Sequence, residues 1–389
     1  MVAPKLRFTG FDLSWSEVIL DDLAEVERGK FSVRPRNDPR YFGGKMPFVQ
    51  TGDVTGSDVY LKGFSQTLNE DGIKVSKVFP EDTILITIAA NIGDTTITQY
   101  PVACPDSVVA IQPKKELTNT IFLKNVIDLQ KDFLDSQATQ NAQKNINLQV
   151  LKPLELIVPS LKEQTKIASF LSAVDEKISQ LSQKHELLSQ YKQGMMQKLF
   201  SQQLRFKADD GSEFGEWENI SVKEIFDVTR GQVLAVSNTV SVADTDYKYP
   251  VFSSQTKQKG LMGFYKKYLF EDALTWTTDG ANAGDVNFRK GKFYCTNVCG
   301  VLLSKKGYAN LCIAEILNKV THKYVSYVGN PKLMNNVMSE IPITIPSNLE
   351  EQTKIANFLS SIDQKIEVVS QQIEQAKTWK KGLLQQMFV

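Results

Sequence analysis

Mostly apolar side chains recur at alternating steps of four and three residues in two stretches of the chain, residues 167–199 and 355–387. The spacing is kept over four to five heptads, which is typical of a long helix that packs against another helix along one seam. Each helix should be about 55 Å long at about 1.5 Å per residue. The seam positions are Ile167, Leu171, Val174, Ile178, Leu181, His185, Leu188, Lys192, Met195 and Leu199, and then Ile355, Leu359, Ile362, Ile366, Val369, Ile373, Ala376, Lys380, Leu383 and Met387.

The two periodic stretches are copies of one another. EQTKIASFLSAVDEKI at 163–178 and EQTKIANFLSSIDQKI at 351–366 differ at four of sixteen positions, with a spacing of 188 residues. The segments before them are repeated as well, because residues 15–29 align with residues 217–231 at a spacing of 202. A repeat of nearly half the chain has to be recognised before any fold is assigned.

The predicted fold class is therefore α+β, with two globular mixed α/β domains at 1–160 and 201–347. A long helix follows each domain, at 161–200 and 348–389. Two such helices in one chain most simply pair with each other. The connections allow either direction, but a pseudo-twofold relation between the repeats requires an antiparallel coiled coil.

Shorter elements follow from local patterns in each copy. Residues 46–51 and 249–254 are predicted as short strands, and residues 83–94 and 273–285 as a strand that runs into a tight loop. Helices are expected at 119–134 and 309–320, and strands at 154–160 and 341–347. Residues 51–83 carry no periodic signal and are interpreted as a divergent loop.

Composition limits the class of protein. A chain of 389 residues with 42% hydrophobic and 23% charged residues is expected to form two to three globular domains. It has no stretch of about 18 apolar residues that could span a membrane. Its start lacks the apolar segment of a signal peptide. Four cysteines in so long a chain do not form a disulfide framework, which favours a reducing cytoplasm.

Basic residues are concentrated in one segment of the first copy, although the net charge is only +1. Residues 28–45 hold six basic side chains and a single acid, Asp38, and Pro, Asn and Gly residues indicate a loop. A solvated surface is the simplest explanation. The interleaved Phe31, Tyr41 and Phe42 favour a phosphate-contact surface instead.

No catalytic or metal-binding motif is found. The two histidines, His185 and His322, lie in different segments, and Cys295 and Cys299 lack a second pair at zinc spacing. These two cysteines are interpreted as small buried residues of one strand. A P-loop and a methyltransferase motif of the N/D-P-P-Y type are also missing. The sequence therefore predicts no active site and no metal site.

The chain closely resembles the specificity subunits of type I restriction–modification systems. The resemblance rests on the doubled helix starts, the RNDPRYFGGKMPFVQTGDV and TQNAQKNIN segments, and the LRF…W start of both copies. It implies that each globular copy is a target-recognition domain for one half of a bipartite, asymmetric DNA sequence. It also implies that the helix pair sets the gap and docks two DNA methyltransferase subunits, which restriction–translocase subunits join. Catalysis, S-adenosylmethionine, ATP and Mg²⁺ would belong to those partners, and this chain would bind no cofactor.

Candidate DNA contacts are chosen by residue type, since Arg, Lys, Asn and Gln best recognise base edges and Lys, Ser and Thr hold phosphates. In the first copy they are Arg34, Arg36, Arg40, Lys45, Gln50, Thr51, Asn91 and Lys144. In the second copy they are Ser253, Ser254, Gln255, Lys257, Lys259, Thr278, Asn282, Arg289, Lys290 and Lys332. A non-catalytic two-headed scaffold that binds proteins is the alternative function. A free-standing nuclease or methylase is disfavoured by the missing motifs.

Overall fold

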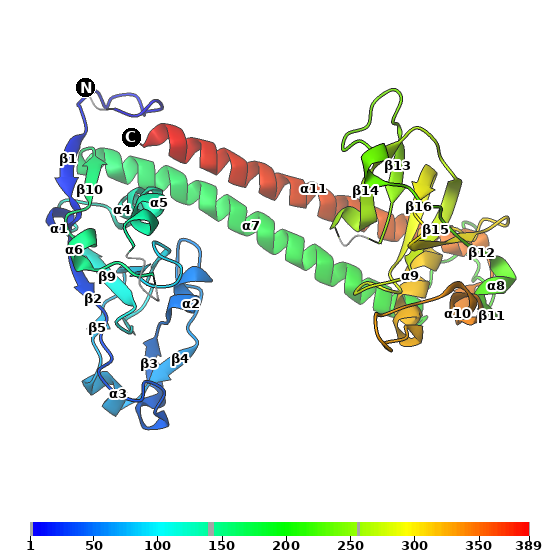
Figure 1. The fold of residues 1–389 in the computed structure, drawn as a ribbon, viewed down its shortest axis with the longest axis horizontal. Coiled ribbons are helices and arrows are strands. Elements are labelled where there is room, and N and C mark those ends of the chain that lie inside the picture. The colour runs from blue at the N-terminus through cyan, green and yellow to red at the C-terminus, as the bar shows by residue number, and fades with distance from the viewer. Residues whose placement is uncertain (1–2, 139–143, 255–256, 389) are drawn as a thin grey trace. The chain divides into compact units, whose positions relative to one another are not determined.

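The two periodic stretches form long helices in the computed structural model, which describes residues 3–138, 144–254 and 257–388 (Figure 1). Helix α7 spans Leu161–Phe200 and helix α11 spans Leu349–Met387. All twenty seam positions predicted from the heptad pattern are buried or half-buried. The chain forms two compact units, unit 1 with Met1–Gln183 and Gln371–Val389 and unit 2 with Lys184–Ser370.

Within unit 1 the start of α7 packs against the end of α11. Ile167 and Leu171 share a hydrophobic core with Leu383 and Met387. The ammonium of Lys380 lies 2.6 Å from a carboxylate oxygen of Asp175. The two helices are therefore antiparallel in this unit.

Within unit 2 the same arrangement occurs with the helices exchanged. Leu199, at the end of α7, shares a core with Ile355 and Leu359, near the start of α11. Lys192 lies 2.8 Å from Asp363, and these residues are the repeat equivalents of Lys380 and Asp175. The antiparallel direction holds in both units.

The globular part of unit 1 contains two four-stranded sheets. The larger sheet has the order β2-β9-β6-β7, and the smaller has the order β4-β3-β8-β5. Strand β1 (Ser16–Ile19) pairs with β10 (Glu155–Val158) separately. The remaining strands are β2 Ala24–Arg28, β3 Phe42–Phe48, β4 Gln66–Leu68, β5 Val78–Phe79, β6 Ile84–Thr87, β7 Thr95–Ile97, β8 Val102–Ala103 and β9 Val108–Pro113. The helices are α1 Leu20–Leu23, η1 Pro39–Tyr41, α2 Thr51–Thr55, α3 Glu70–Lys74, α4 Thr120–Leu129, α5 Lys131–Ser136 and α6 Leu148–Leu151.

Unit 2 joins the equivalent strands into one six-stranded sheet of order β12-β17-β15-β16-β13-β14. Strand β11 (Trp217–Ser221) pairs with β18 (Pro342–Pro346), as β1 does with β10. The other strands are β12 Asp227–Arg230, β13 Tyr249–Phe252, β14 Leu261–Tyr265, β15 Phe270–Thr277, β16 Val286–Cys295 and β17 Cys299–Leu303. The helices are α8 Val222–Ile225, η2 Val236–Asn238, η3 Lys257–Gly260, α9 Leu311–Val320, η4 Thr321–Tyr324 and α10 Asn335–Glu340.

The repeat extends to individual contacts. Strand β3 runs parallel to β8 with Phe48 opposite Ala103, and β13 runs parallel to β16 with Val251 opposite Tyr294, the equivalent positions. Each copy also has a glycine where the backbone passes very close to another strand. A Cβ atom on Gly231 would lie 2.0 Å from the carbonyl oxygen of Cys295.

Near the start of each long helix, a glutamate forms an ion pair with an arginine from the segment that precedes the globular domain. Arg7 donates two hydrogen bonds to the buried Glu163, at 2.7 and 2.8 Å. Arg205 does the same to Glu351, at 3.0 and 2.9 Å. Bidentate pairs of this kind fix orientation as well as distance. In each copy, the arginine of the LRF segment is therefore bound to the glutamate at the start of the long helix.

Four sequence expectations need correction. Residues 51–83 are not one loop but contain α2, β4, α3 and β5. Strand β3 begins at Phe42, inside the predicted basic loop, and the helix expected at 119–134 is split between α4 and α5 at Gln130. Cys295 ends β16 and Cys299 begins β17, so the two lie on strands that are consecutive in sequence rather than on one strand. The elements of 51–83 were missed because pieces of two to five residues show no measurable period.

Candidate nucleic-acid interface

The basic segment of unit 1 covers the small sheet. Asp38 caps η1 by accepting the backbone N–H of Arg40, and the same carboxylate holds the Arg40 guanidinium 2.6 Å away. This contact keeps the pKa of Asp38 below its usual range. Because exposed ion pairs contribute little, Arg40 can change partners at small cost.

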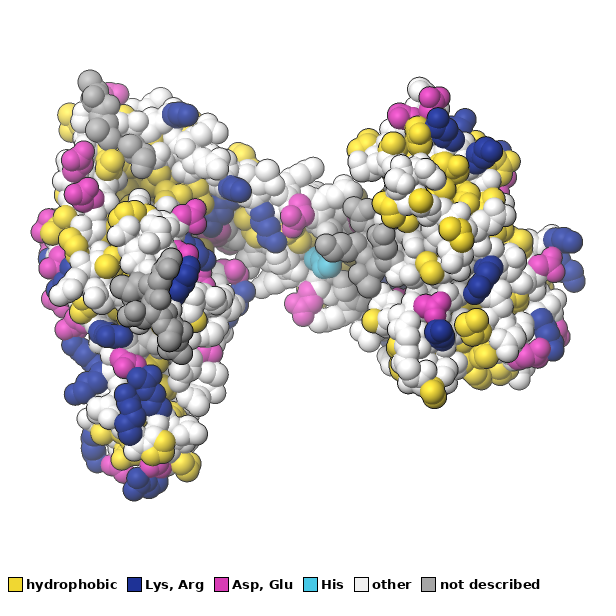
Figure 2. All heavy atoms as spheres, viewed as in Figure 1, with side chains coloured by type: hydrophobic (Ala, Val, Ile, Leu, Met, Phe, Trp, Pro, Cys, Tyr) yellow, Lys and Arg dark blue, Asp and Glu magenta, His cyan; other side chains and the backbone are white. Residues whose placement is uncertain are grey.

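The neighbouring basic residues are held more loosely. Arg36 lies 2.9 Å from Asp106, with half of its side chain exposed, and Arg34 donates to the backbone oxygen of Val33 at 2.8 Å. Lys45 is exposed on β3. Figure 2 shows Lys and Arg side chains gathered over the end of unit 1 where Figure 1 places α3, β3 and β4. The segment therefore presents a local basic surface within an otherwise near-neutral chain.

The aromatic residues of this segment lie in a small core. Phe31 is 5% exposed and packs against Phe42 and Phe48, with ring centroids 5.6 and 5.0 Å apart, while Tyr41 is half-buried beside it. These rings form the small core beneath the basic segment. They support the phosphate-contact hypothesis only indirectly, by holding the basic side chains on a packed base.

Asn69 fixes the shape of the basic surface. Its side chain donates to the carbonyl oxygens of Arg40 and Phe42 at 2.8 and 3.2 Å, and it accepts the N–H groups at the start of α3. One residue therefore joins η1, β3 and α3. Its sequence signal is the N-cap preference for Asn before an acidic helix start.

The other four unit 1 candidates lie on or near α2 and the loop after β6. Gln50 caps α2, whose first residue is Thr51, and donates to the side-chain oxygen of Gln66 at 2.9 Å. Asn91 is exposed and reaches the Thr55 hydroxyl at the end of α2, at 3.3 Å. Lys144 is exposed next to a backbone bridge that joins Asn145 to Ala89, in the loop that carries Asn91. Its ammonium is 3.4 Å from Asp135.

Several unit 2 candidates surround a cavity of about 190 Å³. Ser253, Lys259, Asn282 and Arg289 contribute to its lining, and Asp285 places a carboxylate there. The hydroxyl of Ser253 accepts a hydrogen bond from that of Thr296 at 2.9 Å. The cavity lies between the end of β13 and the turn that follows β15.

Three further unit 2 candidates stand outside this cavity lining. Ser254 is half-buried, and Lys290 is exposed within β16, where the pairing with β15 shifts register. Lys332 is 3.8 Å from Asp279. Gln255 and the side chain of Lys257 fall outside the residues that the structure describes.

Two candidates prove to be interior residues, which corrects the expectation that they lie on the surface. Thr278 is 0% exposed, and its hydroxyl bonds to the Val298 carbonyl at 2.8 Å. Arg289 is 8% exposed, with its guanidinium carbon 3.7 Å from the centre of the Phe252 ring. It donates to the Lys259 carbonyl at 2.6 Å, and burial lowers its pKa to about 10. Thr278 has no accessible atom for DNA, and Arg289 can act only from the floor of the cavity.

Sequence reasoning missed a second basic surface in unit 2. Lys248, Lys266 and Lys292 are exposed on and beside β13, β14 and β16, and each lies over a tyrosine ring. The fragments DYKYP and FYKKYLF contained the signal, since both interleave lysine with aromatic residues. They were overlooked because each is short and they are separated in sequence.

The thiol groups of the chain are buried. All four cysteines are free and buried, and burial raises the pKa of the Cys104 thiol to about 12. Within the described ranges, no group of three or more His, Cys, Asp or Glu residues could hold a metal ion. The described helices also include none with the length and apolar character needed to cross a membrane.

Comparison with known proteins agrees with this doubled architecture. Residues 13–190 and 215–378 match the model of the type I restriction modification DNA specificity domain. The specificity subunit of the type I restriction enzyme MjaVIII from Methanocaldococcus jannaschii is 25% identical over 394 residues, covering 89% of this chain and 88% of that protein. The MpnII specificity subunit of Mycoplasma pneumoniae is 33% identical over 150 residues, which are 38% of this chain and 44% of that protein.

A solved structure shows the same fold. The S subunit of a type I restriction–modification system from M. genitalium superposes with a TM-score of 0.70 at 18% identity, over 100% of this chain and 99% of that one. A second solved chain, from work on complex assembly and conformational transition of the type I R-M system, has a TM-score of 0.57 at 13% identity, covering 97% and 98%. Since the family model covers most of the chain in two separate copies, the chain belongs to the family of type I restriction–modification specificity subunits.

Proposed function

We propose that this chain supplies the DNA sequence specificity of a type I restriction–modification complex. The globular part of each unit would recognise one half of a bipartite, asymmetric DNA site, and the helix pair would set the gap. The main support is that one fold is built twice with different surfaces. Unit 1 carries the basic segment at 28–45, and the aligned stretch of unit 2 has a different sequence.

The helices support a second part of the proposal, the docking of two copies of one partner. Thr165 and Lys177 are exposed on α7, and the same residues recur, also exposed, as Thr353 and Lys365 on α11. Seam packing does not explain identity at exposed positions. A partner that contacts each helix in the same way does explain it, and a DNA methyltransferase subunit would be that partner.

Catalysis would then belong to the partners. Two methyltransferase subunits would bring S-adenosylmethionine and act on adenine, and restriction–translocase subunits would bring ATP and Mg²⁺. The buried thiols and the missing cofactor motifs agree with a non-catalytic role for this chain. Its own ligand would be double-stranded DNA.

Genome-wide mapping of methyladenine with and without this chain tests the proposal. We expect a two-part motif with a fixed gap that disappears when the chain is deleted. Replacing residues 1–160 with the equivalent segment of another family member should change one half of the motif and leave the other half intact. A change in both halves would refute the assignment of one half-site to each domain. Methylation that persists without the chain would refute the function itself.

A further inference from the structure

Unit 2 lacks the basic segment of unit 1 but has basic side chains at the equivalent place in its fold. Strand β13 corresponds to β3 by its parallel pairing with β16, and β14 pairs with β13 as β4 pairs with β3. Lys248 directly precedes β13, and Lys266 directly follows β14. The hairpin therefore brings the two lysines together, because Tyr249 and Tyr265 are opposite one another in its register.

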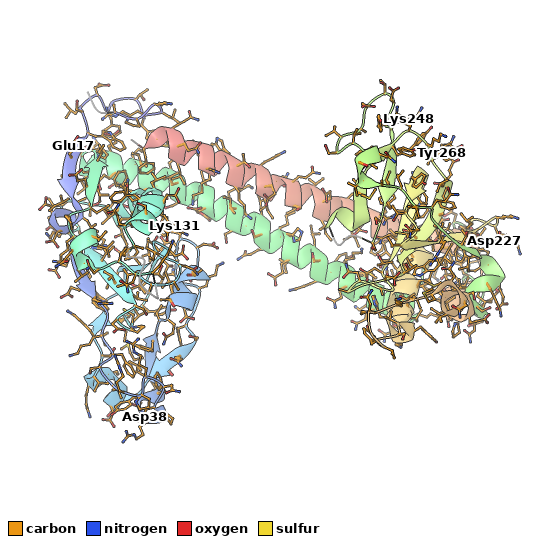
Figure 3. The ribbon with its side chains drawn as sticks, viewed as in Figure 1. Glu17, Asp38, Lys131, Asp227, Lys248 and Tyr268 are labelled. Atoms are coloured by element: carbon orange, nitrogen blue, oxygen red, sulfur yellow. The ribbon has the colours of Figure 1, made fainter. Side chains whose placement is uncertain are left out.

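Tyrosine rings support these lysines. The ammonium of Lys266 lies 4.8 Å from the centre of the Tyr247 ring, and that of Lys248 lies 5.3 Å from the Tyr249 ring. Tyr249 in turn packs against Tyr268, with centroids 5.1 Å apart. Stacking of this kind buries the alkyl stem and leaves the charge exposed. Figure 3 labels Lys248 and Tyr268 at this end of the unit, beside β13 and β14.

A third lysine extends the same surface. Lys292 on β16 lies 4.8 Å over the Tyr268 ring and opposite Glu271 in the sheet. Tyr268 and Glu271 raise its pKa, so it is charged at neutral pH. Tyr268 is 42% exposed and offers a hydroxyl beside the ammonium groups.

Some lysines of unit 2 are paired with carboxylates. Lys223 and Lys354 lie 2.6 and 2.7 Å from carboxylates. In the part of the chain that the structure describes, no carboxylate oxygen lies within 4.0 Å of the ammonium of Lys248, Lys266 or Lys292. In the loop before β13, Asp244 accepts the N–H groups of Asp246 and Tyr247 at 2.8 and 2.6 Å. Lys248 and Lys266 are therefore exposed positive charges without a carboxylate in contact, and Lys292 has Glu271 opposite it at more than contact distance.

We propose that Lys248, Lys266 and Lys292, with the tyrosines beneath them, are the phosphate-contact surface of unit 2. It would replace the basic segment 28–45 of unit 1 at the same place in the fold. This inference rests on the proposed function and adds the residues through which the second domain holds the DNA backbone. Phosphate contacts fix the position of a protein on the duplex and carry no direct sequence information. The surface is therefore a positioning element, and base recognition belongs to other residues.

The test is the salt dependence of DNA binding by the full chain in complex with its methyltransferase subunits. The variant Lys248→Gln/Lys266→Gln removes two charges and keeps part of each stem. The matched control, Lys305→Gln/Lys306→Gln, removes two charges from the exposed turn after β17. Circular dichroism verifies that both variants fold.

The expected result follows from counterion release. Each phosphate contact contributes about 0.9 to the slope of log K against log salt, so the slope should fall by about 2 in the test variant and stay unchanged in the control. Affinity at physiological salt should fall about 10-fold, and the methylated motif should not change. An unchanged slope, or loss of the methyltransferase subunit in place of DNA affinity, would overturn the inference and leave the proposed function intact. A wild-type complex with no sequence preference would instead refute the proposed function.

Discussion

Lys192 provides a sharp test of the helix pairing in unit 2. Its ammonium lies on the seam of α7, 2.8 Å from Asp363 on α11 and 3.2 Å from Glu315 on α9. Only 19% of its side chain is exposed. Replacing Lys192 with Met keeps a long, unbranched side chain but leaves two partly buried carboxylates without their shared cation.

The size of the effect follows from the degree of burial. Exposed ion pairs contribute up to about 1 kcal/mol, and breaking a fully buried pair costs about 3–5 kcal/mol. The burial of the Lys192–Asp363 pair is intermediate between these cases, so we expect the free energy of unfolding to fall by about 2 kcal/mol. Burial alone would lower the pKa of Lys192, but hydrogen bonds and charges from Asp363 and Glu315 outweigh it and raise the pKa. The stabilisation is therefore complete below the ordinary pKa of 10.5 and is lost as the pH rises through the higher folded value.

Hydrogen exchange measured by mass spectrometry is a suitable assay, because it reports helix opening locally in a chain with two units. At neutral pH, peptides from residues 185–199 and 355–369 should lose protection by about 30-fold, since each 1.4 kcal/mol is a factor of about ten. Lys198→Met, an exposed position on the same helix, is the control and should change little. Adding Asp363→Asn to Lys192→Met should recover part of the loss. Equal protection in Lys192→Met and Lys198→Met would refute the argument.

Other predictions concern the interior and the helix ends. Gly231→Ala and Gly29→Ala should each lower stability by more than about 2 kcal/mol in thermal unfolding, because their Cβ atoms would lie 2.0 and 2.3 Å from carbonyl oxygens; equal melting temperatures would contradict this. Gly194 lies in α7 with nothing within 4 Å of its Cβ position, so Gly194→Ala should instead raise the free energy of unfolding by about 0.5–1 kcal/mol, measured in the same way. Arg205→Met should cost about 3 kcal/mol in denaturant unfolding, because it leaves the carboxylate of Glu351 buried at 1% exposure, and the double change with Glu351→Gln should cost less. Cys104 should resist iodoacetamide at pH 8 until the chain is unfolded, since its pKa is about 12; rapid labelling of the native protein would show that the site opens.

The sequence predicts the long-range architecture well, because that architecture has a period. Ten seam positions in each helix repeat every seven residues, and every one of them is buried or half-buried. The segment at 51–83 gave no such signal. Its order depends on single capping residues, Gln50 with Asp53 for α2 and Asn69 for α3, which act over one turn. Elements of a few residues that depend on capping contacts are too short to show a hydrophobic period.

Residue type alone could not separate surface from interior in the candidate site. Arg289 looks like a DNA contact in sequence, but its strand pairs with β15, and Phe252 and the Lys259 carbonyl cover it. The opposite error occurred at Lys248 and Lys266. Seventeen residues of chain separate these two lysines, and only the pairing of β13 with β14 brings them together. Burial and convergence both depend on strand register, which a single sequence does not determine.

The lysine–aspartate pairs between the long helices occur once in each unit, at equivalent positions of the repeat. The pair Lys192–Asp363 is equivalent to the pair Lys380–Asp175, because both the lysines and the aspartates are 188 residues apart in the repeat. Each helix therefore contributes the lysine of one pair and the aspartate of the other. A globular domain could be exchanged for a different one without altering either pair, provided that the new domain supplies a carboxylate in place of Glu315 beside Lys192. The chain can thus change what its domains bind while its helical frame stays the same.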